Sequence, residues 1–214
     1  MKRRDFSAGL LAAGAIGLPV MAQQQPVSRV TPAEYRQIGR PAPVDAPQGK
    51  IELVEFFWYS CPHCNAFEPV LQEWSKKLPS DVVLRRIPVA FRDDFVPQQR
   101  LFYTLEALGK VDELHAKVFQ AIHAERQPLV REEPILAWAQ KQGLDRAKFQ
   151  EVFNSFAVSA KTKRAVQMQD AYSVEGVPAL GVAGRFYTDG SVAGTMQRAV
   201  QVAEHLIAEI RKSR

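Results

Sequence analysis

The chain has 214 residues, of which 46 % are hydrophobic and 24 % are charged. That length is enough for one domain with a substantial core, or for one domain that carries an insertion. The composition is typical of a folded protein and argues against a disordered chain. The formal net charge of +5 is small and partly resides in the first residues, so it gives no argument for nucleic acid as a partner.

The first 22 residues predict a cleaved export signal. Met1 to Arg4 form a positive n-region, residues 8–20 are an uncharged run rich in Ala, Gly and Leu, and Ala22 ends a site that a signal peptidase reads. The run is shorter than the ~20 residues that span a bilayer, which argues against an anchor. Arg3-Arg4 also resembles a twin-arginine signal, so the export route stays open. We therefore expect a periplasmic protein that begins at Gln23.

Residues 23–50 form an N-terminal segment that is Gln-rich at first and then rich in turn residues. Residues 51–59 are a nearly continuous apolar run, typical of a strand buried on both faces. A helix follows from Pro62, because proline suits the first helical position and apolar residues then recur at helical spacing. Residues 81–90 predict a second strand, which completes a βαβ unit.

A helical block and a C-terminal β-β-α unit follow. Residues 177–188 predict a hairpin, and Thr195 is placed to cap a last helix that extends to Ile210. The order of elements indicates an α/β chain in which residues 51–96 and 174–214 form one domain and residues 97–173 an inserted helical domain. The helices predicted for the block are 97–109, 112–125, 131–142, 145–154 and 156–173.

Two cysteines, Cys61 and Cys64, are separated by two residues. Such a short loop gives a structural disulfide only about 2 kcal/mol in the chain-entropy model, so the spacing favours a redox role. A zinc site needs about four ligands, and there is no second cysteine pair. Haem attachment needs a histidine directly after the second cysteine, where Asn65 stands. We therefore expect no metal and no cofactor other than the cysteine pair.

The position of Pro62 makes Cys61 the N-cap of the predicted helix. Its sulfur then faces the N–H groups of His63 and Cys64 and the positive end of the helix dipole, which favour a thiolate. His63 adds a further donor or a positive charge. We expect a lowered pKa at Cys61, which makes it the sulfur that substrates attack. Cys64, one turn into the helix, is expected to be more buried and to act as the resolving partner.

Glu55 interrupts the apolar strand, and a carboxylate there is costly unless it is paired or functional. Two interpretations stay open. In one, Glu55 exchanges protons with the Cys64 thiol through water. In the other it is structural, either reaching solvent at the strand end or pairing with Arg85 or Arg86. The remaining histidines stand alone on predicted helices, where packing is the expected role of each: His115, His123 and His205.

The motif Cys61-Pro62-His63-Cys64, with Glu55-Phe56-Phe57 before it and Gly176-Val177-Pro178-Ala179 far downstream, resembles the bacterial periplasmic DsbA oxidants. The resemblance runs from about Tyr35 to the last helix and implies a thioredoxin-like fold with an inserted helical domain. It also implies a cis Val177–Pro178 bond against the Cys61 sulfur, where the Val177 backbone pairs with an extended substrate. The approach to the motif, residues 58–60, departs from the apolar aromatics of many relatives and leaves substrate preference open.

The resemblance further implies a catalytic cycle. A reduced, unfolded exported protein takes the disulfide from the Cys61–Cys64 pair, and a DsbB-type, quinone-linked membrane protein reoxidises the pair. A disulfide isomerase or reductase is a weaker alternative, since the roughly 28 residues before Ile51 are too few for a dimerisation domain. A chaperone that binds clients without turnover is a third. A monomer is expected, because no coiled-coil heptads occur.

Overall fold

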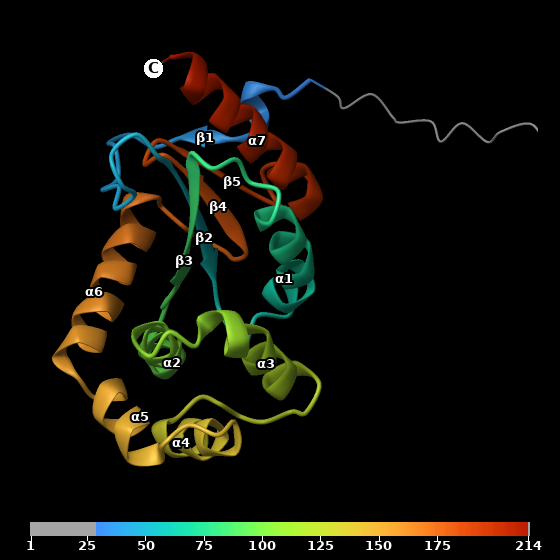
Figure 1. The fold of residues 1–214 in the computed structure, drawn as a ribbon. Helices are drawn as coiled ribbons and strands as arrows, with labels where there is room; N and C mark the ends of the chain where they lie inside the picture. Colours follow the sequence, from blue (N-terminus) through green and yellow to red (C-terminus); the bar gives the residue numbers. More distant parts are fainter. Residues whose placement is uncertain (1–28, 214) are drawn as a thin grey trace, which may run out of the picture.

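The computed structural model describes residues 29–213, so the predicted export signal lies outside the described residues. Within that range one mixed sheet has the strand order β1-β5-β4-β2-β3 (Figure 1). Neighbours β2 and β3 are parallel, whereas the other pairs are antiparallel. The strands are β1 (Arg36–Gln37), β2 (Ile51–Phe57), β3 (Val82–Pro88), β4 (Ala179–Val182) and β5 (Phe186–Asp189).

The two faces of the sheet have separate cores, because successive side chains of a strand point to opposite faces. On one face Leu53 packs with apolar side chains of α1 and α7, including Leu71 and Leu206. On the other face Phe56 packs with Tyr172 and with the helical block. Figure 1 shows α1 and α7 on one side of the sheet and α6 on the other. The helices of these layers are α1 (Pro62–Ser75), α6 (Phe156–Ala171) and α7 (Met196–Lys212).

The remaining helices gather beyond the end of the sheet at which β2 finishes (Figure 1). They are α2 (Val96–Ala107), α3 (Val111–His123), α4 (Glu132–Lys141) and α5 (Arg146–Phe153); short 3₁₀ turns occur at η1 (Pro32–Glu34) and η2 (Asp93–Phe95). Each helix of the block lies where the sequence predicts one. The mixed sheet with helices on both faces and a helical block beyond its end matches the predicted α/β architecture with a helical insertion.

The sequence predicts no strand in the N-terminal segment, but residues 36–37 form the edge strand β1 against β5. The chain continues along the β4–β5 turn, where the N–H of Ala42 donates to Gly184 O at 2.8 Å. Gly184 has φ +67°, and a Cβ there would lie 2.5 Å from Ala42 O. This close approach of two backbones explains why glycine stands at the turn.

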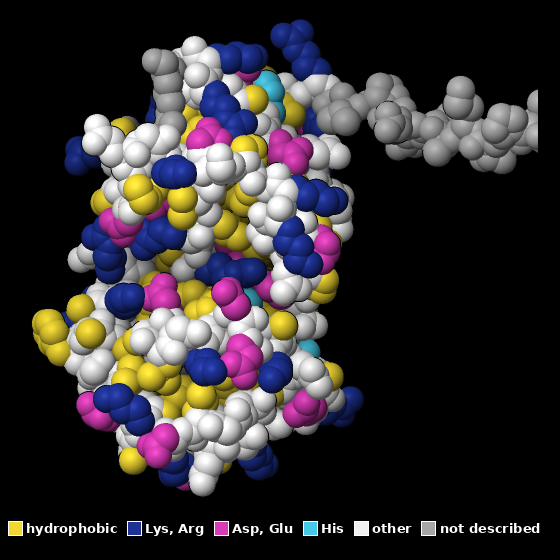
Figure 2. All heavy atoms as spheres, viewed as in Figure 1, with side chains coloured by type: hydrophobic (Ala, Val, Ile, Leu, Met, Phe, Trp, Pro, Cys, Tyr) yellow, Lys and Arg dark blue, Asp and Glu magenta, His cyan; other side chains and the backbone are white. Residues whose placement is uncertain are grey.

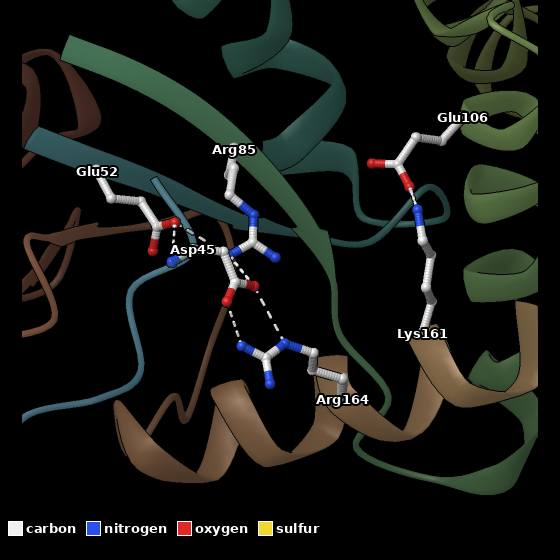
Figure 3. A network of polar contacts seen from close by, with 6 residues as sticks. All are labelled: Asp45, Glu52, Arg85, Glu106, Lys161 and Arg164. Carbon is white, nitrogen blue, oxygen red and sulfur yellow. Dashed lines mark hydrogen bonds and ion pairs between the residues drawn. The ribbon is translucent and has the colours of Figure 1, made fainter. Parts of the chain in front are cut away.

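Ion pairs connect α6 to the rest of the molecule (Figure 3). Asp45 of the N-terminal segment binds both Arg85 of β3 and Arg164 of α6, and Arg85 also contacts the buried Glu52 at 3.0 Å. Lys161 of α6 pairs with Glu106 of α2. Each part-exposed pair contributes little alone. Figure 2 shows acidic and basic side chains interspersed over the viewed face, as the small net charge suggests.

Candidate active site

Cys61 lies at the junction between the sheet and the helical block. Strand β2 ends at Phe57, a tight turn follows in which the Cys61 N–H donates to Trp58 O at 3.0 Å, and α1 begins at Pro62. The backbone of Cys61 is extended, and its sulfur accepts a hydrogen bond from the Cys64 N–H at 3.4 Å. Cys61 is therefore the N-cap of α1, as the sequence predicts.

The two sulfurs differ sharply in their surroundings. The pKa of Cys61 is lowered to about 6, chiefly by the hydrogen bond with the Cys64 side chain and then by the N–H groups of Cys64 and His63, against the opposing effect of burial. Cys64 is fully buried, and burial together with the Cys61 sulfur raises the pKa of its thiol. Both are free thiols in this structure. These surroundings favour the thiolate form at Cys61 and the thiol form at Cys64 in the reduced pair.

A loop before β4 faces the Cys61 sulfur. The Val177–Pro178 peptide bond is cis, as the resemblance implies, and Cys61 Sγ lies 3.4 Å from Val177 O, a contact in which the protonated thiol donates. A groove of about 480 Å³ runs beside this loop, with His63 at one wall and Thr195 and Met196 at the start of α7. The backbone of Val177 therefore lies at the reactive sulfur and at the edge of an open groove.

Glu55 is 1 % exposed, so the expectation that it could reach solvent at the strand end is wrong. Its partner is Arg86, its neighbour in the β2–β3 register, with Arg86 Nη1 2.6 Å from Glu55 Oε2. Arg86 also holds Glu68 of α1 through two hydrogen bonds, of 2.6 and 2.9 Å. Arg85, the other proposed partner, binds Glu52 and Asp45 instead.

Glu55 and Glu68 are two buried carboxylates that share Arg86, and their pKa values move in opposite directions. Burial raises the pKa of Glu55 to about 7; Arg86 opposes the shift, and the charge of Glu68 adds to it. Burial acts on Glu68 in the same direction, but contacts with His115 and Arg86 outweigh it and lower the pKa. The charge of Glu55 in turn contributes to the raised pKa of Cys64. Glu55 is therefore electrostatically linked to Cys64.

His115 is more than the packing residue that its isolated position in the sequence suggested. It is buried, its Nδ1 lies 2.8 Å from the Tyr59 hydroxyl, and its Nε2 lies 3.3 Å from Glu68 Oε2. Burial lowers the pKa of the imidazole, which favours the neutral form. Sequence reasoning thus missed the set Tyr59, Glu68 and His115. Glu68 carried a signal, because it stands four residues after Cys64 on the buried face of α1.

Residues 29–213 contain no group of three or more His, Cys, Asp or Glu side chains arranged to hold a metal ion. No helix in the same range is long and apolar enough to cross a membrane.

Proteins that place a Cys-x-x-Cys pair at a helix N-terminus of a thioredoxin-like sheet are thiol–disulfide oxidoreductases, and this chain is of that class. Residues 83–201 match the family model of the DSBA-like thioredoxin domain. That segment begins after the cysteine motif, so the match is independent of the motif. The chain belongs to the DSBA-like thioredoxin family.

Similar proteins extend the match over nearly the whole chain. The chain is 44 % identical over 205 residues to the thiol:disulfide interchange protein DsbA of Bordetella pertussis, covering 95 % of this chain and 96 % of that protein. It is 36 % identical over 211 residues to DsbA of Pseudomonas aeruginosa, covering 99 % and 98 %.

Solved structures agree with these relatives. The crystal structure of Pseudomonas aeruginosa DsbA superposes with a TM-score of 0.80 at 39 % identity, over 85 % of this chain and 94 % of that one. DsbA from Xylella fastidiosa gives a TM-score of 0.79 at 26 % identity, over 86 % and 98 %.

Proposed function

We propose that this chain is a disulfide donor for exported proteins and that the Cys61–Cys64 pair carries the reaction. The observation that supports this most strongly is the contrast between the two sulfurs. A lowered pKa at Cys61 stabilises the reduced pair, and a stabilised reduced form makes the disulfide a stronger oxidant. The same stabilisation makes Cys61 a good leaving group when a substrate completes its own disulfide.

The proposed reaction consists of two successive thiol–disulfide exchanges. A substrate thiolate attacks the sulfur of Cys61 in the oxidised pair, the Cys61–Cys64 bond breaks, and Cys64 leaves with the electron pair and takes up a proton. A second substrate thiolate then attacks the substrate sulfur of the mixed disulfide, and Cys61 leaves as a thiolate. Two substrate thiols become one disulfide, while the protein pair gains two electrons.

Pro62 and His63 support this chemistry from within the motif. Pro62 starts α1 directly after Cys61, and the N–H of His63 and its charge favour the Cys61 thiolate. Val177 and Pro178 are assigned to substrate binding. The Val177 backbone beside Cys61 offers hydrogen-bonding groups to an extended peptide, and the adjoining groove has room for its side chains.

Glu55 is assigned to proton exchange with Cys64. Because burial raises the pKa of Glu55 to about 7, it can supply a proton near neutral pH when Cys64 leaves as a thiolate, and recover it on reoxidation. Its pairing with Arg86 is compatible with this role, since the arginine is shared with Glu68.

The family also suggests the cellular setting. Membership implies exported proteins as substrates and a partner that restores the disulfide. We propose reduced, unfolded exported proteins as clients, a DsbB-type quinone-linked membrane protein as the oxidant, the periplasm as the compartment, and a monomer as the working form. No cofactor is proposed beyond the cysteine pair.

The test is turnover with a reduced, unfolded model protein in the presence of a small-molecule oxidant. A disulfide donor forms substrate disulfides catalytically, and Cys61→Ser abolishes the activity. Binding without disulfide formation would instead indicate a client-holding protein. An isomerase would be favoured if the protein reactivates a substrate with scrambled disulfides faster than it oxidises the same substrate in its reduced form.

A further inference from the structure

The turn before Cys61 is held by side chains of the helical block. In this turn, residues 58–61, the N–H of Cys61 donates back to Trp58 O. Such a bond leaves the central peptide unit, formed by the carbonyl of Tyr59 and the N–H of Ser60, without a partner inside the turn. Buried backbone groups require partners elsewhere.

Both polar ends of this central peptide are bound by the insertion. The Ser60 N–H donates to Gln98 Oε1 of α2 at 3.1 Å, and the Tyr59 carbonyl lies 2.8 Å from His123 Nε2 of α3. A carbonyl only accepts, so His123 donates through Nε2–H. One peptide is thus clamped by two different helices.

Gln98 is itself fixed and buried. It is 1 % exposed, and its Nε2 donates to Ser60 Oγ at 2.7 Å and to Leu129 O at 3.1 Å. The side-chain amide therefore has every partner needed to hold one orientation. Its position joins the active-site turn to the connection between α3 and α4.

The clamp acts on the one motion that a β-turn makes easily. Rotation of the central peptide interconverts turn types I and II, and type II needs a positive φ at the third residue. Ser60 does not adopt a positive φ, so the turn is not type II. The two helices hold this peptide in one orientation and so anchor the end of the turn from which Cys61 departs, and the Cys61 sulfur lies 3.4 Å from Cys64 N and from Val177 O.

We propose that Gln98 and His123 are positioning residues for the exchange reaction: by holding the Tyr59–Ser60 peptide, they keep the Cys61 sulfur on the donors at the N-terminus of α1. The helical insertion then tunes the cysteine pair without touching either sulfur. This inference rests on the proposed role of Cys61 as the stabilised thiolate.

The variants Gln98→Leu and His123→Leu test the proposal by removing one end of the clamp each. The control is Gln99→Leu, because Gln99 is the next residue of α2, is equally buried and donates instead to Pro88 O. The readouts are the pH titration of the Cys61 thiolate and the equilibrium constant for oxidation of glutathione thiols by the protein. Weakening one hydrogen bond to the sulfur corresponds to about a two- to tenfold change in each equilibrium.

We expect Gln98→Leu and His123→Leu to raise the pKa of Cys61 and to lower the glutathione equilibrium constant about two- to tenfold. Gln99→Leu should leave both quantities unchanged. His123→Gln, which keeps a side-chain N–H donor, should recover the wild-type values. Should Gln98→Leu fail to fold, His123→Leu carries the test, because His123 is only part-buried. Wild-type values in the folded clamp variants would overturn the inference. An ordinary Cys61 pKa in the wild-type protein would instead overturn the proposed function.

Discussion

The backbone N–H of Cys64 points at the sulfur of Cys61, 3.4 Å away, so the second cysteine of the motif helps to stabilise the first as an anion. We expect the rate of Cys61 alkylation by iodoacetamide to titrate with a midpoint near pH 6, because the pKa of Cys61 is lowered to about 6. Reactivity should persist above that pH and fall below it, as the thiolate is protonated. A midpoint near the ordinary value of 9.0 would contradict the N-cap account.

The burial of Cys64 predicts what happens when this residue is removed. Cys64→Ser whose Cys61 has first been converted to a mixed disulfide with glutathione can still exchange with one substrate thiol, releasing glutathione, but it lacks the thiol that would displace the substrate again. We expect covalent substrate complexes to accumulate and to be visible by mass spectrometry under non-reducing conditions. Cys61→Ser is the matched variant and should trap none, since Cys64 is fully buried. Equal trapping by both variants would show that substrates reach either sulfur.

Glu55 predicts a pH dependence of stability. Its folded pKa, raised to about 7 from 4.5, means that the native state binds the proton more tightly than the unfolded state, so this group costs stability as the pH rises from 4.5 to about 7. Glu55→Gln removes that cost. Between pH 4.5 and about 7 the free energy of unfolding of the variant should therefore rise relative to that of the wild type by up to roughly 3 kcal/mol. Urea unfolding of the reduced proteins at both ends measures this. Parallel pH profiles would mean that Glu55 keeps an ordinary pKa.

The same variant tests the proton role of Glu55. Glu55→Gln cannot exchange a proton, so we expect slower release of Cys64 and a changed pH profile of exchange with a thiol substrate. Stopped-flow measurement of the first exchange step gives both quantities. If the rate and its pH profile match the wild type, Glu55 is a structural partner of Arg86 and has no part in proton transfer.

Gly181 of β4 predicts a packing constraint. A Cβ at this position would lie 2.5 Å from Cε1 of Tyr172, a buried ring that also packs edge-on against Phe56. Gly181→Ala should therefore destabilise the protein by about 1–3 kcal/mol, because the ring must shift within a filled core. Gly39→Ala is the control, since a Cβ there meets nothing within 4 Å. Equal urea midpoints for the two variants would show that Tyr172 moves aside freely.

Local sequence patterns were sufficient for most of the fold. Three of these patterns are the nearly continuous apolar run of β2, the proline at the start of α1 and the helical spacing in the block. Each depends only on residues close in the sequence, so it can be recognised without knowledge of the tertiary structure. The edge strand β1 is different. Two residues acquire strand geometry only by pairing with β5, about 150 positions further along the chain.

The candidate site divides in the same way. The Cys61 N-cap follows from the position of Pro62 alone, and the sequence predicts it. The partners of Glu55 depend on the β2–β3 register and on how α1 lies over the sheet, neither of which is encoded locally. Gln98 and His123 belong to helices whose own patterns give no reason to connect them with Tyr59 and Ser60.

The most direct test of the account is the redox equilibrium of the purified protein with glutathione, read by trapping free thiols over a range of thiol-to-disulfide ratios. Stabilisation of the Cys61 thiolate predicts that the pair stays mostly reduced until the buffer is strongly oxidising, as a disulfide donor requires. A pair that is already oxidised in strongly reducing buffer would contradict the account, and would identify Cys61–Cys64 as a reductant or a structural bridge.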